Sequence, residues 1–297
     1  LPLGGMAVAL RFYCEGQGKV LPVTVMAVLM VCWNAFFKYG LMFGNLGMPA
    51  LGLKGCGLAT ALGMAAFFLM LLGYVTLNPA QAAKRLFKGF GLPDMGALKR
   101  LTIVGAPIGF SITSEYLVYS AITFFISASG AVAVGAHQVA YTCMLLFFAT
   151  PAALCLRSSI RGGALNGQPA TDALRQSVTG IMALGALIGA VYTVIMFFGA
   201  TRLAAALSTD PAVILVAAGL IRIAAVFQFC GAVQVCFIGI LRGVGDTAKP
   251  FAITAAIYWL FCLPFGYVLS GMPLPLGLSL SPELLGIKGW WVALTIS

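Results

Sequence analysis

The chain contains few side chains that could do chemistry: of its 297 residues, 7 are Asp or Glu and one is His. Glu115 is the only acidic residue deep within a long apolar segment, where Ser114 and Tyr116 flank it. A carboxylate inside a bilayer is costly unless it is paired, hydrated or protonated. Burial favours its neutral form, so a proton could bind and leave, whereas a bound cation would hold it ionised. We predict that Glu115 couples an ion to a conformational change; the alternative is a neutral Glu hydrogen-bonded across helices.

Three further features could support such a site. Pro107 precedes Glu115 in the same segment and frees a backbone carbonyl, so bending there could gate the molecule, although passive packing explains it equally well. His137 reads as a hydrogen-bonded helix residue rather than a proton relay. Aromatic side chains suited to a cavity for flat lipophilic cations are Tyr116, Phe147, Tyr258 and Trp259.

An enzyme is not indicated. The sequence has no GxSxG, HExxH or GxxxxGK[ST] pattern, and a single His gives no catalytic dyad or metal set. The eight Cys form no CxxC pair and read as buried free thiols. We therefore expect no cofactor and no resident metal. The 17 Lys and Arg are scattered between apolar stretches, which is typical of membrane topology markers and not of a nucleic-acid-binding surface.

Composition identifies the elements that must position these residues. Hydrophobic residues make up 61% of the chain and charged residues 8%, with a mean hydropathy of +1.04, which excludes a soluble globular domain. We predict an all-α integral membrane protein, because a span needs ~20 mostly apolar residues. A partial segment ends near Phe12, and a further segment begins at Gly289. Between them we predict seven spans, at 20–43, 55–77, 101–128, 131–156, 177–207, 212–241 and 250–269.

The positive-inside rule orients these spans. Alternating the loops leaves only Lys54, Arg202 and Lys288 on one side. The other side, which we assign to the cytoplasm, receives Arg11, Lys19, Lys84, Arg85, Lys88, Lys99, Arg100, Arg157, Arg161, Arg175, Arg242 and Lys249. The connection 78–100 is the longest and most basic, so it reads as a linker between two halves. Trp290 and Trp291 read as interfacial anchors.

An internal repeat supports two halves. Gly16, Gly18, Pro22 and Tyr39 match residues 227 or 228 positions later, and LGLKG at 51–55 matches LGIKG at 285–289, with an offset of 234. Both copies cross in the same sense, as in parallel repeats of transporters. By this repeat we expect the first half to lack three helices and the second half to lack its last one. The intact protein would have twelve helices, and this chain about eight plus a stub.

Charged residues beside the two GxG elements have a different role in this interpretation. Glu15, Arg242 and Asp246 lie at predicted cytoplasmic helix ends, where salt bridges that lock the two lobes or cap helix termini explain them better than catalysis does. We divide the chain into 1–77, the C-terminal half of a first six-helix lobe; 78–100, a basic cytoplasmic linker; and 101–297, a second lobe truncated before its last helix.

The sequence resembles the multidrug and toxic compound extrusion (MATE) family, in particular its NorM-like branch. The matching stretches are collinear and are CEGQGKVLP (14–22), YGLMFGNLGMPALGLKGCGLATA (39–61), GAPIGFSITSE (105–115), GAHQVA (135–140), SSIRGGALNG (158–167), GILRGVGDT (239–247) and YWLFCLPFGY (258–267). The resemblance implies a two-lobed, multi-pass exporter of the inner membrane. It would expel lipophilic, often cationic compounds by alternating access, driven by a proton or sodium gradient, as a monomer in contact with membrane lipid.

The resemblance also bears on mechanism. The family's seventh-helix glutamate falls on Glu115, whereas the tenth-helix aspartate of NorM-like members falls on Gly231. The loss of that carboxylate weakens the case for sodium, because a hard cation would have fewer charged ligands. The competing function is a flippase for lipid-linked precursors. That function would require several basic residues in its cavity for pyrophosphate, and the predicted spans contain only Lys38 and Arg222.

Overall fold

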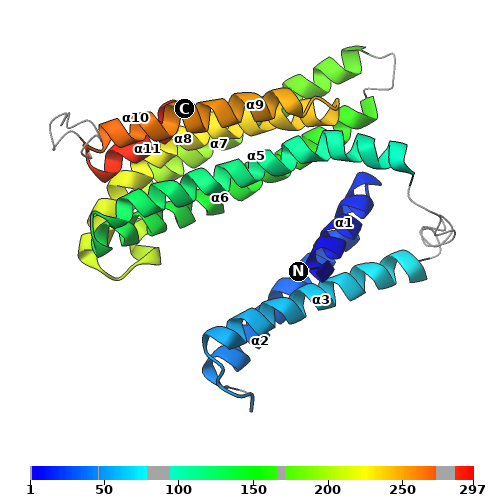
Figure 1. The fold of residues 1–297 in the computed structure, drawn as a ribbon, viewed down its shortest axis with the longest axis horizontal. Coiled ribbons are helices and arrows are strands. Elements are labelled where there is room, and N and C mark those ends of the chain that lie inside the picture. The colour runs from blue at the N-terminus through cyan, green and yellow to red at the C-terminus, as the bar shows by residue number, and fades with distance from the viewer. Residues whose placement is uncertain (1, 46, 79–93, 166–170, 272–284) are drawn as a thin grey trace. The chain divides into compact units, whose positions relative to one another are not determined.

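The structure is a computed structural model that describes residues 2–45, 47–78, 94–165, 171–271 and 285–297. All regular elements in these ranges are helices (Figure 1). The chain divides into two compact units, Leu1–Leu92 and Pro93–Ser297, each with its own core. The division falls inside the predicted linker, of which residues 79–93 lie outside the described residues, as do the last two residues of the matching stretch 158–167.

The first unit contains three helices: α1 (Pro2–Gly16), α2 (Val20–Phe43) and α3 (Leu53–Leu77). Helix α3 packs against both α1 and α2. The α2–α3 contact is close at Gly55, because a Cβ there would overlap the carbonyl group of Leu41. The small apolar core consists of Ala7, Cys14, Val23, Phe67, Leu71 and Val75.

The second unit is larger, and its helices run side by side in Figure 1. They are α5 (Met95–Ser127), α6 (Ala131–Leu165), α7 (Thr171–Leu207), α8 (Pro211–Gly243), α9 (Ala248–Ala256), η1 (Ile257–Cys262), α10 (Leu263–Leu269) and α11 (Ile287–Ile296). Helix α8 is the centre of the unit, since α6, α7 and α11 all pack on it, while α5 packs on α6 and α9. Small residues permit this: a Cβ at Gly239 would overlap the backbone of Cys155 in α6.

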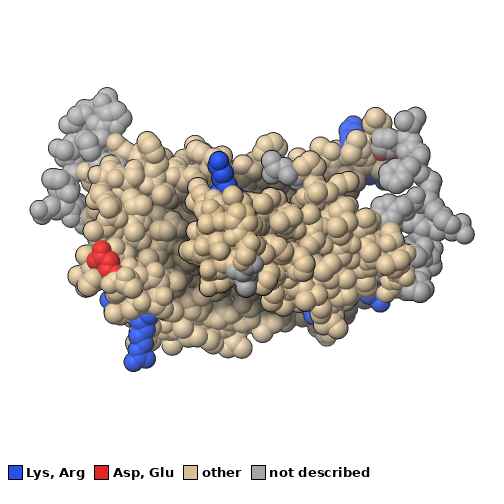
Figure 2. Space-filling model, turned by 90° about the horizontal axis from the view of Figure 1, so that it is seen from below, with Lys and Arg blue, Asp and Glu red and all other residues tan. Residues whose placement is uncertain are grey.

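Within the described residues, seven helical stretches are long and apolar enough to cross a membrane, in agreement with the predicted number of spans. They are α2, α3, α5, α8, the continuous stretch Ala248–Leu269, and the apolar parts Ala131–Gly163 of α6 and Val178–Leu207 of α7. The face drawn in Figure 2 carries only scattered charged side chains, as expected for a surface in contact with lipid.

Several helices extend beyond their predicted ends. Helix α5 begins at Met95 rather than Leu101, because the Asp94 side chain caps it by accepting a hydrogen bond from the Gly96 amide at 2.8 Å. The last six residues of the predicted linker, 95–100, are therefore helical. Asp210 caps α8 in the same way, with its side chain 2.9 Å from the amide of Ala212.

The stretch Ala248–Leu269 is not a regular α-helix. Its middle, η1, is a π-helical turn in which the Leu263 amide donates to the carbonyl of Tyr258. Pro264 follows directly and has no N–H to donate, so the regular pattern of α-helical hydrogen bonds cannot continue through this point. Widened turns of this kind are frequent at functional sites.

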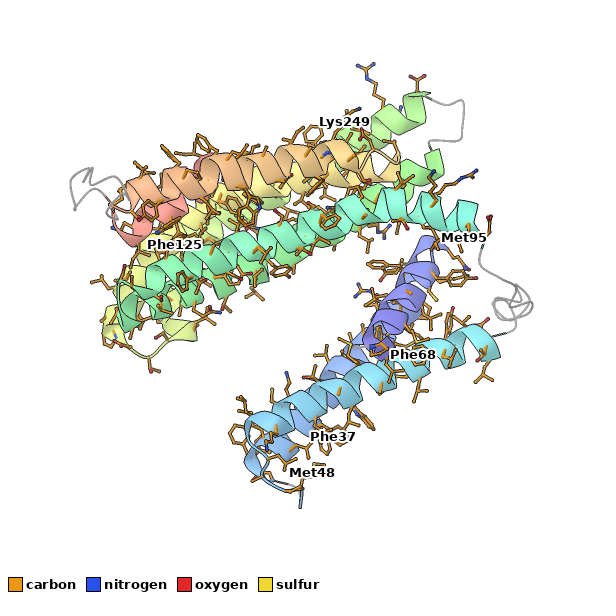
Figure 3. All side chains as sticks on the ribbon, viewed as in Figure 1. Phe37, Met48, Phe68, Met95, Phe125 and Lys249 are labelled. Carbon is orange, nitrogen blue, oxygen red and sulfur yellow. The ribbon has the colours of Figure 1, made fainter. Side chains whose placement is uncertain are left out.

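The prediction that Trp290 and Trp291 are interfacial anchors is wrong. Both side chains are 1% exposed and lie in the core of the second unit. Trp290 stacks on Phe125 with ring centroids 5.2 Å apart, near the end of α5 where Figure 3 labels Phe125. Trp291 meets His137 edge-on at 5.6 Å. Helix α11 packs against α8 and α10, so its tryptophans face protein instead of the membrane boundary.

Candidate functional site

A cavity of about 290 Å³ lies within the second unit, and Glu115 is part of its wall. Helices α5, α6 and α8 and the α9–η1 segment all contribute to it. From α8 come Gln234 and Arg242, and from the α9–η1 segment come Thr254 and Tyr258. Elements distant in sequence thus place one carboxylate, one guanidinium and several neutral polar groups around one space.

Tyrosine is the most frequent polar residue in the cavity wall. Tyr116, Tyr119, Tyr141 and Tyr258 all line it. Tyr119 and Tyr141 lie with ring centroids 5.0 Å apart, and the Tyr119 hydroxyl donates to the sulfur of Met144 at 3.7 Å. Aromatic faces and a polarisable sulfur attract organic cations, and the phenol groups offer hydrogen bonds beside the carboxylate.

Gly231 also lines the cavity. A Cβ at this position would meet nothing closer than the Phe227 ring, at 3.9 Å, so a methyl group would fit. Among the residues that line the cavity, Glu115 is the single acid. No group of three or more His, Cys, Asp or Glu within the described residues could hold a metal ion.

The predicted cavity residues separate into two groups. Tyr116 and Tyr258 line the cavity, whereas Phe147 and Trp259 do not. Phe147 meets Tyr192 of α7 edge-on at 5.1 Å, and its neighbour Phe148 takes the place in the wall. Successive residues of a helix point ~100° apart, so an error of one position exchanges a cavity residue for a packing residue.

Trp259 contacts the site indirectly. Its indole Nε1 donates a hydrogen bond to the Ser114 hydroxyl at 2.6 Å, and Ser114 directly precedes Glu115. This bond ties the π-helical turn to α5 next to the carboxylate. Pro107 is not among the lining residues, and α5 continues as a helix through it.

Of the three charged residues predicted to lock the lobes, Glu15 and Asp246 form ion pairs with residues three or four positions away, and Arg242 lines the cavity. Arg11 Nε lies 2.7 Å from Glu15 Oε1 in α1, and Lys249 Nζ lies 2.8 Å from Asp246 Oδ2. Figure 3 labels Lys249 in the first turn of α9. The hydrogen bond from Lys249 lowers the pKa of Asp246 below its ordinary value. Arg242 makes neither pair and instead lines the cavity.

The sequence interpretation missed Arg242, Gln234, Tyr119 and Tyr141 as cavity residues. A signal was present for most of them. Tyr119 follows Glu115 by four residues, and Gln234 precedes Arg242 by eight, both spacings that place residues on one helix face. Tyr141 could be found only from the packing of α6 against α5.

A family model described as MatE matches residues 107–268, more than half of the chain and the whole of the cavity wall. The chain belongs to the MatE family. MatE proteins are transporters and not enzymes. The membrane-length helices and the family together identify this chain as a multi-pass protein of the inner membrane.

Curated relatives are similar to this MatE chain over nearly all of its length. It is 35% identical over 289 residues to "Multidrug resistance protein MdtK" of Yersinia pestis (strain Pestoides F). A protein of the same description from Yersinia enterocolitica is 34% identical. Each alignment covers 97% of this chain and 62% of the relative, so the chain spans about three fifths of the length of the relatives that it matches.

Solved MATE structures share the fold. A crystal structure of MATE in complex with MaL6 has a TM-score of 0.82 at 16% identity, covering 98% of this chain and 62% of that one. A mutant of the Vibrio cholerae MATE transporter VcmN has a TM-score of 0.81 at 15% identity, covering 99% and 63%. The all-α MatE fold predicted from the sequence is thereby confirmed.

Proposed function

We propose that the protein to which this chain belongs is a multidrug exporter that exchanges lipophilic cationic compounds for protons or sodium ions by alternating access. The observation that carries the proposal is the position of Glu115. It is the single acid in the wall of a cavity formed by membrane-length helices, and tyrosines, Met144 and Phe148 surround the same space. The multidrug resistance described for the similar MdtK proteins supports the substrate class.

In this mechanism Glu115 binds either the coupling ion or the cationic substrate. When Glu115 is ionised, it attracts an organic cation to the aromatic wall of the cavity. When it takes up a proton or a sodium ion, that attraction is lost and the substrate leaves. Arg242 lines the same cavity, and no ion pair joins it to Glu115 among the described residues. The guanidinium can therefore lower the cost of the ionised carboxylate without blocking it.

Protons are the better candidate for the coupling ion. Sodium prefers several oxygen ligands with charge among them, and Glu115 is the single acid in the cavity wall, to which Gly231 contributes no side-chain oxygen. Export from proteoliposomes under a pH gradient alone, compared with a sodium gradient alone, distinguishes the two ions. The absence of pH-driven export together with full sodium-driven export would reject proton coupling.

The central test is Glu115→Gln in the full-length protein, because the amide keeps the shape and removes the charge. We expect export of a lipophilic cation such as ethidium to fall at least tenfold at equal expression. Asp210→Asn is the matched control, since this acid caps α8 away from the cavity. Unchanged export in the Glu115→Gln variant would reject the proposed role.

The flippase alternative is less well supported. A pyrophosphate group calls for several cationic side chains, and Arg242 is the single one that lines this cavity. Drug-resistance assays and lipid-precursor transport assays on the same protein separate the two functions. We also expect the exporter to act as a monomer, which light scattering in detergent would check.

A further inference from the structure

A second depression adjoins the Glu115 cavity within the same unit. It is an apolar groove of about 500 Å³ between α8 and α9. Phe229, Phe237 and Ile253 are part of its wall, and all three side chains are exposed. The groove exists because α9 packs on α5 while α8 packs on α6 and α7, so that α8 and α9 are held apart.

The groove and the cavity adjoin and share part of their walls. Gln234, Ile238 and Thr254 belong to the walls of both. Two of these three residues are polar, so the junction carries an amide and a hydroxyl between an apolar space and a charged one. A molecule with a cationic end and an apolar arm matches this order of surfaces.

The volumes point to the same arrangement. Sites for drug-sized ligands usually measure ~300–1,000 Å³, so the cavity alone, at about 290 Å³, is at the small end of that range. The adjoining groove offers the space that the cavity lacks. A ligand that extended from the cavity into the groove would bury more apolar surface than one that filled the cavity alone, and apolar burial supplies most of the affinity for lipophilic compounds.

We propose that the groove between α8 and α9 is a subsite for the apolar arm of an amphiphilic cation whose charged end lies in the Glu115 cavity. This inference rests on the proposed function and deepens it, because it adds that elongated amphiphilic cations bind more tightly than compact ones. The competing occupant is a lipid acyl chain, which would fill the groove independently of any cation.

The first test uses alkyltrimethylammonium ions from butyl to dodecyl, which share one head group. Binding to the purified full-length protein is measured by displacement of radiolabelled tetraphenylphosphonium. Each methylene that enters the groove should tighten binding about fourfold. Ile253→Trp fills the groove from an exposed position and should abolish this increase while leaving the butyl compound unchanged.

The control is Leu260→Trp, a substitution at a still more exposed position on the same helical stretch, outside the groove. The Leu260→Trp variant should retain the dependence of binding on chain length. Because detergent is the same in both experiments, the comparison also corrects for partitioning of the compounds into detergent. An unchanged dependence in Ile253→Trp would overturn the subsite. Loss of butyl binding in Glu115→Gln is read separately, because it tests the cavity. A failed proposed function and a failed groove therefore give different results.

The second test uses a native thiol and requires no bulky substitution. Cys230 lies in the groove wall and, contrary to the expectation of buried thiols, is exposed. Dodecyltrimethylammonium should slow its modification by N-ethylmaleimide at least fivefold, and the butyl compound should not; Cys230→Ser identifies the modified site by mass. No protection, or equal protection by phospholipid vesicles without the cation, would overturn the proposal.

Discussion

The two copies of the internal repeat share the backbone geometry of their turns but carry different side chains. The turn after α1 and the turn after α8 each contain a left-handed glycine, Gly18 with φ 75° and Gly245 with φ 87°. In both, the next residue donates its amide to a carbonyl five residues earlier, at 3.0 Å. The Gly-x-Gly pattern therefore defines a helix stop that does not depend on the residues around it.

The second pair of matched glycines is equally close. Gly52 before α3 has φ 54° and ψ −128°, and Gly286 before α11 has φ 51° and ψ −130°. One turn later, a Cβ at Gly55 would overlap the backbone of Leu41, and one at Gly289 would overlap the backbone of Leu269. The repeat is thus conserved within the chain where the backbone geometry requires it.

The copies differ where the second one forms the cavity. Helix α2 is one regular α-helix, whereas its counterpart contains the π turn before Pro264, and Phe36 stands at the matching place in α2. At the turns the charges are reversed, because Glu15 and Lys19 correspond to Arg242 and Asp246. The copies therefore share their turns and differ in charge and in helix type, and Tyr258 of the π turn lines the cavity.

Among substitutions in the two copies of the repeat, Gly55→Ala and Gly289→Ala should reduce stability most. Each added methyl group would overlap backbone, so we expect about 3 kcal/mol of destabilisation in both copies. Melting of the detergent-solubilised protein, followed by size-exclusion chromatography, measures it. Gly57→Ala on α3 is the control, since nothing lies within 4 Å of its Cβ position. A control that melts as early as the two variants would refute the close approach.

The two ion pairs should differ in strength. Glu15 is 5% exposed and its second carboxylate oxygen has no hydrogen-bond partner, so Arg11→Ala would leave a buried charge unpaired. We expect a loss of about 2 kcal/mol. Lys249→Ala removes an exposed partner and should change the melting temperature little. Equal effects of the two substitutions would contradict the difference in burial.

A smaller effect should follow Gly18→Ala and Gly245→Ala. A left-handed residue with a Cβ costs ~1 kcal/mol, so both variants should melt slightly earlier. Gly16→Ala, at the end of the helix and with open space around it, should be neutral or stabilising. If Gly16→Ala lowered the melting temperature as much as the other two variants, the left-handed turn would not be the cause of the loss.

The smallest effect concerns pH. The bond from Lys249 lowers the pKa of Asp246 in the folded state, so its contribution to stability is complete above the unfolded pKa of about 3.9. It is lost as pH falls through the lower folded value. Wild-type protein should therefore melt slightly later than Asp246→Asn at pH 7, and the difference should disappear in strong acid. A difference in melting temperature that grows on acidification would contradict a lowered pKa of Asp246.

The number of spans was predictable because hydropathy reports directly on lipid contact. The bounds of α2 were correct, since Gly18 and Gly44 punctuate both of its ends. Helix α5 is longer than predicted, because it begins at Met95, before the apolar part of the helix, and hydropathy gives no signal in that polar first section.

The site was only partly predictable. Glu115 is conspicuous because a charge is rare in an apolar segment, and the structure places it in a cavity wall. The choice between Phe147 and Phe148 depends on helix rotation, which a uniformly apolar segment does not specify. The burial of Trp290 and Trp291 depends on how α11 packs, which no local pattern contains.

The hydrogen bond between Trp259 and Ser114 supplies the protein with an optical reporter. Indole emission responds to the polarity and charge around its N–H, and this N–H lies one residue from the proposed ion-binding carboxylate. Two of the other three tryptophans are enclosed in the core and offer a steady background. Within these 297 residues, replacing Trp33 alone would therefore leave the Trp259 emission above a steady background, so that ion occupancy could be followed without any attached dye.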